Sequence, residues 1–170
     1  DDTEPLSPYG VSKLAAEKYI MLMAPKMKIK PVILRLFNTF GSRQTMTPYV
    51  GVITIFINNI INRKICKIFG NGKQKRDFIY VGDVSNAILL SIKSKKSEGQ
   101  IFNIGSSKVY SIKTIYKTIK SVIKKGKSIN VKKDTTELNY VSANIDKAKK
   151  MLGFKPQYTF ENKIREVVKY

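Results

Sequence analysis

Apolar and polar positions follow a helical period near the start of the chain, over residues 8–23. Ser7 followed by Pro8 is typical of a helix start, with the serine as N-cap and the proline as first helical residue. Apolar residues then recur every three or four positions through VSKLAAEKYIML, and Pro25 ends the pattern. The sequence therefore predicts a first helix that ends near Met23.

The next segments alternate between strand and helix patterns. PVILRLF (31–37) is short, apolar and rich in β-branched residues, which predicts a strand buried on both faces of a parallel sheet. Its one charge, Arg35, is expected to pair with a buried carboxylate. NTFGSRQTMTPY (38–49) is predicted as a polar loop. GVITIFINNIINRK (51–64) has the length of a helix, although its isoleucines also permit a strand.

The second half of the chain repeats this alternation. CKIFGNGKQKRDFIYV (66–81) indicates a strand, a glycine-containing turn and a strand, and QIFNIG (100–105) a further strand. Asp83 and Ser111 are predicted to cap helices, Gly153 to end a short helix that starts near residue 144, and residues 160–170 to form a last amphipathic helix. Strands that alternate with helices predict an α/β fold.

Composition narrows the functional classes. The chain has 170 residues, no histidine and a single cysteine, Cys66, which excludes a Ser-His-Asp mechanism, an internal disulfide and a histidine or multi-cysteine metal site, so no metal is expected. No apolar run reaches membrane-spanning length, and the acidic start is unlike a signal peptide, so a cytoplasmic enzyme or binding domain is expected. The formal charge of +20 raises nucleic acid as a partner, but scattered lysines without a recognised nucleic-acid motif favour solvated lysine faces.

One pair near the N-terminus has catalytic potential. Tyr9 and Lys13 are one helical turn apart, so both side chains project from one face. An ammonium close to a tyrosine hydroxyl favours the phenolate, and such a tyrosine can act as a general base near neutral pH. The same spacing recurs at Tyr116 and Lys120, in surroundings that suggest no site, so the spacing alone is weak evidence.

The surrounding motifs supply a resemblance. PLSPYGVSKLAAEKY, LRLFNTFGSRQ, IFGNGKQKRDFIYVGDV, FNIGSS and KAKKMLGFKP occur in this order. Together they resemble the extended short-chain dehydrogenase/reductase family, the NAD-dependent nucleotide-sugar epimerases and dehydratases. TPYVGVITIFI is most similar to UDP-glucose 4-epimerases. The resemblance runs over nearly the whole chain.

The resemblance implies a role for each of ten residues. Tyr9 would be the catalytic base or acid, Lys13 would bind the nicotinamide ribose and tune Tyr9, and Leu36 would complete the cofactor-binding set. The substrate-binding set would be Phe37 and Asn38 at the sugar and diphosphate, Val52 and Ile53 near the nucleotide, Lys67 and Phe69 near the uracil, and Arg76 at the diphosphate. As residue types alone, the apolar members are equally typical of a core, Asn38 of a loop start and Arg76 of an exposed surface.

Three positions depart from the family pattern. Asp134 stands where an arginine is expected, with Lys132 and Lys133 just before it, and a lysine there would lose bidentate phosphate binding. Asn144 replaces an aspartate, and Gly82 replaces the first aspartate of a pair whose second member, Asp83, is kept. These changes leave the catalytic assignment intact but weaken the expectation of tight nucleotide-sugar binding.

The resemblance also implies a missing half. Family members carry an N-terminal glycine-rich turn for the dinucleotide and a catalytic serine or threonine, and no G-x-G-x-x-G follows a strand here. In GNGKQK, Lys75 occupies the third glycine position. The chain is thus expected to be the C-terminal part of a Rossmann-type parallel sheet (1–43, with the Tyr-x-x-x-Lys helix) plus a smaller α/β nucleotide-sugar-binding lobe (44–170).

Several functions follow from this expectation. The chain would be a fragment of a UDP-glucose 4-epimerase-like enzyme, inactive alone, with NAD as cofactor, a UDP-sugar as substrate and a homodimer as its assembly. A dehydratase, decarboxylase or reductase of the same family, or a non-catalytic nucleotide-sugar-binding remnant, remains open, and a nucleic-acid binder has only the charge in its favour.

Overall fold

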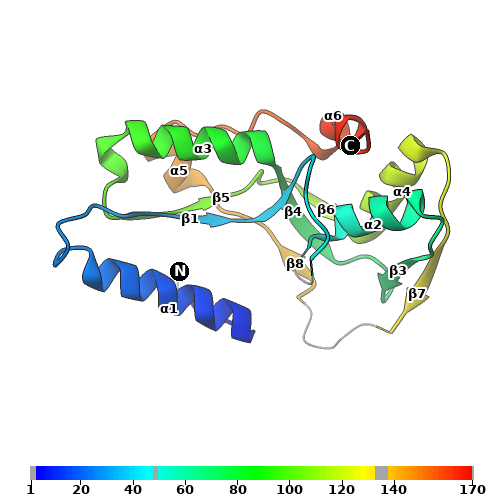
Figure 1. Ribbon diagram of the computed structural model, residues 1–170, viewed down its shortest axis with the longest axis horizontal. Helices are drawn as coiled ribbons and strands as arrows, with labels where there is room; N and C mark the ends of the chain where they lie inside the picture. The colour runs from blue at the N-terminus through cyan, green and yellow to red at the C-terminus, as the bar shows by residue number, and fades with distance from the viewer. Residues whose placement is uncertain (1–2, 48–49, 133–137, 170) are drawn as a thin grey trace.

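The computed structural model describes residues 3–47, 50–132 and 138–169, which form a mixed α/β structure (Figure 1). Its helices are α1 (Pro8–Met23), α2 (Val52–Ile61), α3 (Val81–Lys93), α4 (Ile112–Ile123), α5 (Asp146–Leu152) and α6 (Phe160–Val167), with a 3-10 turn η1 (Lys95–Ser97). Its strands are β1 (Val32–Leu36), β2 (Asn38–Phe40), β3 (Cys66–Phe69), β4 (Lys75–Tyr80), β5 (Gln100–Ile104), β6 (Val109–Ser111), β7 (Ser128–Val131) and β8 (Tyr140–Val141). The predicted α/β class is confirmed.

Parallel pairing dominates the strands. β1 pairs with β5, with Leu34 opposite Phe102, which places a distant segment beside the predicted buried strand. β2 and β8 lie parallel to β4, and β6 lies antiparallel to it. β3 pairs with β7, so the two strands on either side of the turn predicted within GNGKQK (70–75) belong to different sheets. The boundary after residue 43 stays a prediction, although β5 extends the β1 sheet from far along the chain.

Two hydrophobic clusters hold the layers together. One lies under α2, α4 and α6, where Phe40, Phe56, Ile119 and Phe160 are almost fully buried. The other joins α3 and α5 to β4 and β5, around Phe102 and residues such as Ile79, Ile104, Ala148 and Phe154. These clusters fix β2 and β4 relative to the surrounding helices, and both strands carry predicted site residues.

Local signals set several helix ends. The Ser7 hydroxyl accepts a hydrogen bond from the Gly10 amide at 3.1 Å, and the Ser111 hydroxyl accepts one from the Thr114 amide at 3.0 Å. Gly153 ends α5 in the left-handed conformation at φ 68°. The prediction that Asp83 caps its helix is wrong, because the N-cap of α3 is Tyr80. The Asp83 carboxylate is instead buried and accepts hydrogen bonds from the amides of residues 157 and 158.

Other differences lie in short strands. Residues 38–40 were predicted as loop and form β2, because they pair with residues 78–80. The strands β6, β7 and β8 follow no strong apolar alternation and were not predicted. The segment that was ambiguous between helix and strand is the helix α2, whose Ile53, Phe56 and Ile60 face the core at helical spacing.

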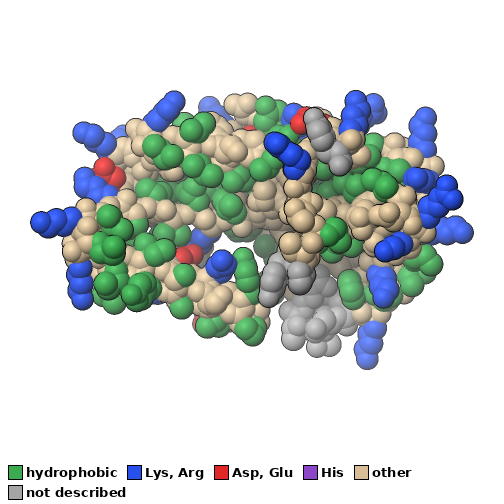
Figure 2. Space-filling view, viewed as in Figure 1, with side chains coloured by type: hydrophobic (Ala, Val, Ile, Leu, Met, Phe, Trp, Pro, Cys, Tyr) green, Lys and Arg blue, Asp and Glu red, His purple; other side chains and the backbone are tan. Residues whose placement is uncertain are grey.

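Helix α1 differs from the others in its packing. It runs alongside β1, on the side away from α3 (Figure 1), and has no buried residue. Hydrophobic side chains gather over it on the face shown in Figure 2, and its exposed residues include Val11, Tyr19 and Leu22. No helix formed by the described residues combines the length and apolar character needed to cross a bilayer.

Candidate functional site

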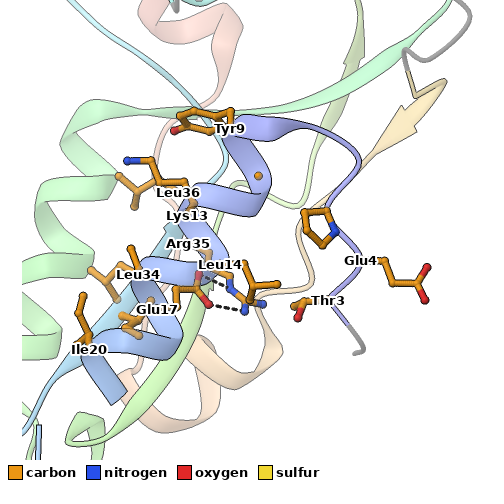
Figure 3. Close-up of a pocket in the computed structure, with 14 residues that line it drawn as sticks. Thr3, Glu4, Tyr9, Lys13, Leu14, Glu17, Ile20, Leu34, Arg35 and Leu36 are labelled. Atoms are coloured by element: carbon orange, nitrogen blue, oxygen red, sulfur yellow. Dashed lines mark hydrogen bonds and ion pairs between the residues drawn. The ribbon is translucent and has the colours of Figure 1, made fainter. Parts of the chain in front are cut away.

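Tyr9 and Lys13 lie on one face of α1, as predicted. Because Pro8 is the first helical residue, Tyr9 occupies the first turn and Lys13 the second. The Lys13 Nζ atom is 5.4 Å from the centroid of the Tyr9 ring, and both side chains border the cavity drawn in Figure 3. The Tyr9 residue is 61% exposed.

Further along α1, beyond Tyr9 and Lys13, an ion pair joins the helix to β1. Arg35 donates from Nε to Glu17 Oε1 at 2.9 Å and from Nη2 to Glu17 Oε2 at 2.6 Å (Figure 3). The hydrogen bond from the guanidinium to Glu17 raises the pKa of Arg35 above its usual value. The expected carboxylate partner of Arg35 is therefore Glu17, and the pair lines the same cavity of about 640 Å³ as Tyr9, Lys13 and Leu36.

A second cavity, of about 520 Å³, shares Tyr9 and Leu36 with the first. Phe37, Asn38 and Ile53 border it. The Asn38 side chain donates from Nδ2 to the Asp77 carbonyl at 2.7 Å, which fixes its position at the start of β2. Ile53 is 1% exposed and belongs to the hydrophobic core. It also borders this cavity.

A third cavity, of about 560 Å³, shares Asn38 with the second. It is lined by Val52 of α2, Lys67 and Phe69 of β3, and Arg76 of β4. Phe69 is 50% exposed, which is unlike a core residue. All ten residues assigned by the family resemblance therefore line three cavities that share wall residues. The alternative pair, Tyr116 and Lys120, is elsewhere, because Tyr116 is buried in the core.

Asp77 supports this wall and was not among the predicted residues. Its carboxylate, which is fully buried, accepts from the Ser106 amide and hydroxyl at 2.8 and 2.7 Å, from the Ser107 amide at 2.9 Å and from the Ala143 amide at 3.1 Å. It thereby holds the loop after β5 and the segment after β8 beside Arg76. A charge inside the apolar run DFIYV was the signal that could have identified it.

The family departures have local structural explanations in two cases. A Cβ atom at Gly82 would lie 2.8 Å from Cε1 of Tyr80, so the Tyr80 ring occupies the space of a larger residue there. The Asn144 side chain accepts from the Asp146 amide at 2.9 Å, a contact that an aspartate would make equally well. Asp134 and Lys133 lie outside the described residues.

Two positive charges border the third cavity. Lys67 and Arg76 are the charged members among the described residues that line it. Cationic side chains at a cavity wall favour binding of an anion such as a phosphate.

Comparisons with known proteins show the family. The family model described as "NAD dependent epimerase/dehydratase family" matches residues 1–105, and the chain belongs to this family. A Methanocaldococcus jannaschii protein named "Putative UDP-glucose 4-epimerase" is 39% identical over 98% of this chain and 53% of its own length. The dTDP-4-dehydro-6-deoxyglucose reductase of Escherichia coli is 32% identical over 95% of this chain and 51% of its own.

Solved structures give the same result for the fold. The UDP-glucuronic acid 4-epimerase of Bacillus cereus, in complex with UDP-glucuronic acid and NAD, superimposes with a TM-score of 0.88 at 30% identity. The match covers 98% of this chain and 53% of that structure. The chain thus spans about half the length of the relatives it matches.

The residues present fit one end of NAD. The Lys13 ammonium supplies donors and the Tyr9 hydroxyl a donor and acceptor, which suit the hydroxyls of a ribose. Leu36 adds an apolar surface beside them. The pyrophosphate has no counterpart in this chain, since its sequence lacks the glycine-rich turn.

Proposed function

We propose that this chain is the catalytic-helix and substrate-binding half of an NAD-dependent nucleotide-sugar epimerase that acts at sugar carbon 4. The observation that carries the proposal is the arrangement of the ten residues along three connected cavities. Tyr9 and Lys13 lie at one end, and Arg76 and Lys67 at the other. A nucleotide sugar would extend between them, with its diphosphate at Arg76 and its sugar near Tyr9.

The chemistry asked of this chain is proton transfer and orientation. Tyr9 would take the proton of the 4-hydroxyl and later return it, and Lys13 would stabilise the negative charge on its oxygen. Arg76 would hold the diphosphate through its planar guanidinium. When bound, NAD would supply hydride acceptance and return at carbon 4.

The proposal includes a covering polypeptide. Among the described residues β1 pairs only with β5, and no residue of α1 is fully buried. An apolar strand with an open edge and an exposed apolar helix are typical of a surface that another segment covers. Relatives are about twice as long, which supports a dinucleotide-binding half as that segment.

The test provides the dinucleotide-binding half as a separate polypeptide. The chain is coexpressed with the portion of the M. jannaschii relative that it does not span, and conversion of UDP-galactose to UDP-glucose is measured. We expect turnover that Tyr9→Phe abolishes and Tyr116→Phe leaves unchanged. Turnover that survives Tyr9→Phe would refute the assignment. In parallel assays, loss of water from UDP-glucose, loss of carbon dioxide from UDP-glucuronate, or reduction of a 4-keto nucleotide sugar by NADH would identify the dehydratase, decarboxylase or reductase alternative. UDP binding without turnover would favour the non-catalytic remnant.

A further inference from the structure

The second cavity is the middle one, because it shares wall residues with both of the others. Its lining indicates the class of sugar that it would bind. Its apolar wall is formed by Leu36, Phe37, Phe40, Ile53 and Phe78, and its polar side chains are Tyr9, Asn38, Thr39 and Gln44. None of the described residues that line it is charged. Arg43, next to Gln44, is exposed and is not part of the wall, and Lys13 borders the neighbouring cavity instead.

The two amide side chains of the cavity are each held by one hydrogen bond. The Thr54 hydroxyl donates to Gln44 Oε1 at 2.6 Å, so the Nε2 donors of Gln44 take no part in this contact. Asn38 donates one Nδ2 hydrogen to the Asp77 carbonyl at 2.7 Å, which leaves its acceptor Oδ1 and a second Nδ2 hydrogen. The cavity therefore offers a donor from Gln44 and both an acceptor and a donor from Asn38.

This combination suits a hydroxyl and disfavours a carboxylate. A sugar hydroxyl can accept from Gln44 and donate to Asn38 Oδ1, whereas an ionised carboxylate only accepts and leaves Asn38 Oδ1 without a donor. A carboxylate would also lose water in a largely apolar cavity without a cation to compensate it. From the described residues, a neutral sugar fits this cavity better than a uronic acid.

We propose that Gln44, positioned by Thr54, is a specificity-determining residue that makes the site select a neutral hexose over a uronate. The proposal rests on the proposed function, because it assumes that the sugar of a nucleotide sugar occupies the middle cavity. It adds the chemical class of that sugar and names the residue that sets it.

The experiment is calorimetric titration of the chain with UDP, UDP-galactose and UDP-glucuronate. We expect UDP-galactose to bind at least as tightly as UDP, and UDP-glucuronate to bind about tenfold more weakly than UDP-galactose. Gln44→Ala should lower UDP-galactose affinity severalfold and leave UDP affinity unchanged, and Thr54→Val should give a smaller loss in the same direction. Gln44→Arg should reverse the preference toward UDP-glucuronate.

The control is Gln157→Arg, which adds the same charge at an exposed glutamine outside the cavity. An equal gain for UDP-glucuronate in both arginine variants would reveal a general charge effect and overturn the role of Gln44. Equal or tighter binding of UDP-glucuronate by the unaltered chain would overturn selection of a neutral sugar while leaving the proposed function standing. Absence of UDP binding would instead overturn the proposed function itself.

Discussion

Arg35 and Glu17 form a two-point ion pair that joins β1 to the helix carrying Tyr9 and Lys13. The side chains are 33% and 16% exposed, so the pair is largely shielded from water. Since α1 has no buried residue, this ion pair is a principal attachment of the helix to the described part of the chain. The placement of Tyr9 and Lys13 thus depends on a contact one to two turns further along the helix.

We expect Glu17→Gln to loosen α1 without unfolding the rest of the chain. The substitution leaves a shielded guanidinium without its carboxylate, which costs about 1 to 3 kcal/mol locally. Hydrogen exchange should show faster exchange over residues 8–23 while α4 stays protected. Lys30→Gln is the control, because the Lys30–Glu98 pair is exposed and contributes at most about 1 kcal/mol. Unchanged exchange in α1 of the Glu17 variant would show that other contacts hold the helix.

Sequence reasoning succeeded where the signal is local. Ser7, Ser111 and Gly153 mark helix ends because a hydroxyl cap or a left-handed glycine acts within a few residues. Arg35 was recognised as needing a carboxylate because it interrupts an apolar strand. Its partner Glu17 was not identified, since the contact depends on how α1 lies against β1.

What sequence reasoning missed depends on contacts distant in the chain. β2 is a strand because Asn38 lies opposite Phe78, and β7 because Ser128 lies opposite Cys66. Gln44 gave no signal in the sequence, since its position follows from a hydrogen bond to α2. The ten site residues were assigned by motif, and their common surface appears only when β1, α2, β3 and β4 are brought together.

The two Tyr-x-x-x-Lys pairs should respond differently to removal of a hydroxyl. The Tyr116 hydroxyl is buried and has no hydrogen-bond partner within residues 3–47, 50–132 and 138–169, so Tyr116→Phe should leave the free energy of unfolding unchanged or raise it by up to about 1 kcal/mol. Tyr9→Phe, at an exposed position, should leave stability unchanged and remove turnover in the reconstituted enzyme. Urea unfolding of both variants provides the measurement, and a destabilised Tyr116→Phe protein would reveal a partner for that hydroxyl.

Asp77 should be among the least replaceable residues of the chain. In Asp77→Asn an amide N–H₂ would face backbone amides that now donate to the carboxylate, so about 3 kcal/mol of stability should be lost. UDP affinity should also fall, because the segment after β8 loses its anchor beside Arg76. Asp146→Asn is the control, since that side chain is 79% exposed. Denaturant unfolding and UDP titration of both variants test the prediction, and equal behaviour of the two would contradict it.

NAD should bind poorly to the chain by itself. Lys13 and Tyr9 supply contacts for a ribose, but this sequence contains no glycine-rich turn for the pyrophosphate. Calorimetry with NAD should therefore give no micromolar binding, while UDP binds through the cavity lined by Lys67 and Arg76. Micromolar NAD affinity in this chain would contradict the need for a second half.

Tyr110 should make stability fall at alkaline pH. Burial, together with the hydrogen bond from its hydroxyl to Glu161 Oε2 at 2.8 Å, raises the pKa of Tyr110 from 10.0 to about 12. The folded state then holds this proton more tightly than the unfolded state, so the contribution is complete below pH 10 and is lost between pH 10 and about 12. The loss should be on the order of 1 kcal/mol, below the full linkage value, because the phenol is partly exposed.

The lysine side chains also titrate between pH 10 and 12 and change stability over that range. The measurement therefore compares the unfolding of Tyr110→Phe with that of a control, Tyr140→Phe, at a tyrosine that is 59% exposed. The decline between pH 10 and 12 should be shallower in Tyr110→Phe alone, and parallel curves would show that the Tyr110–Glu161 contact does not couple to stability.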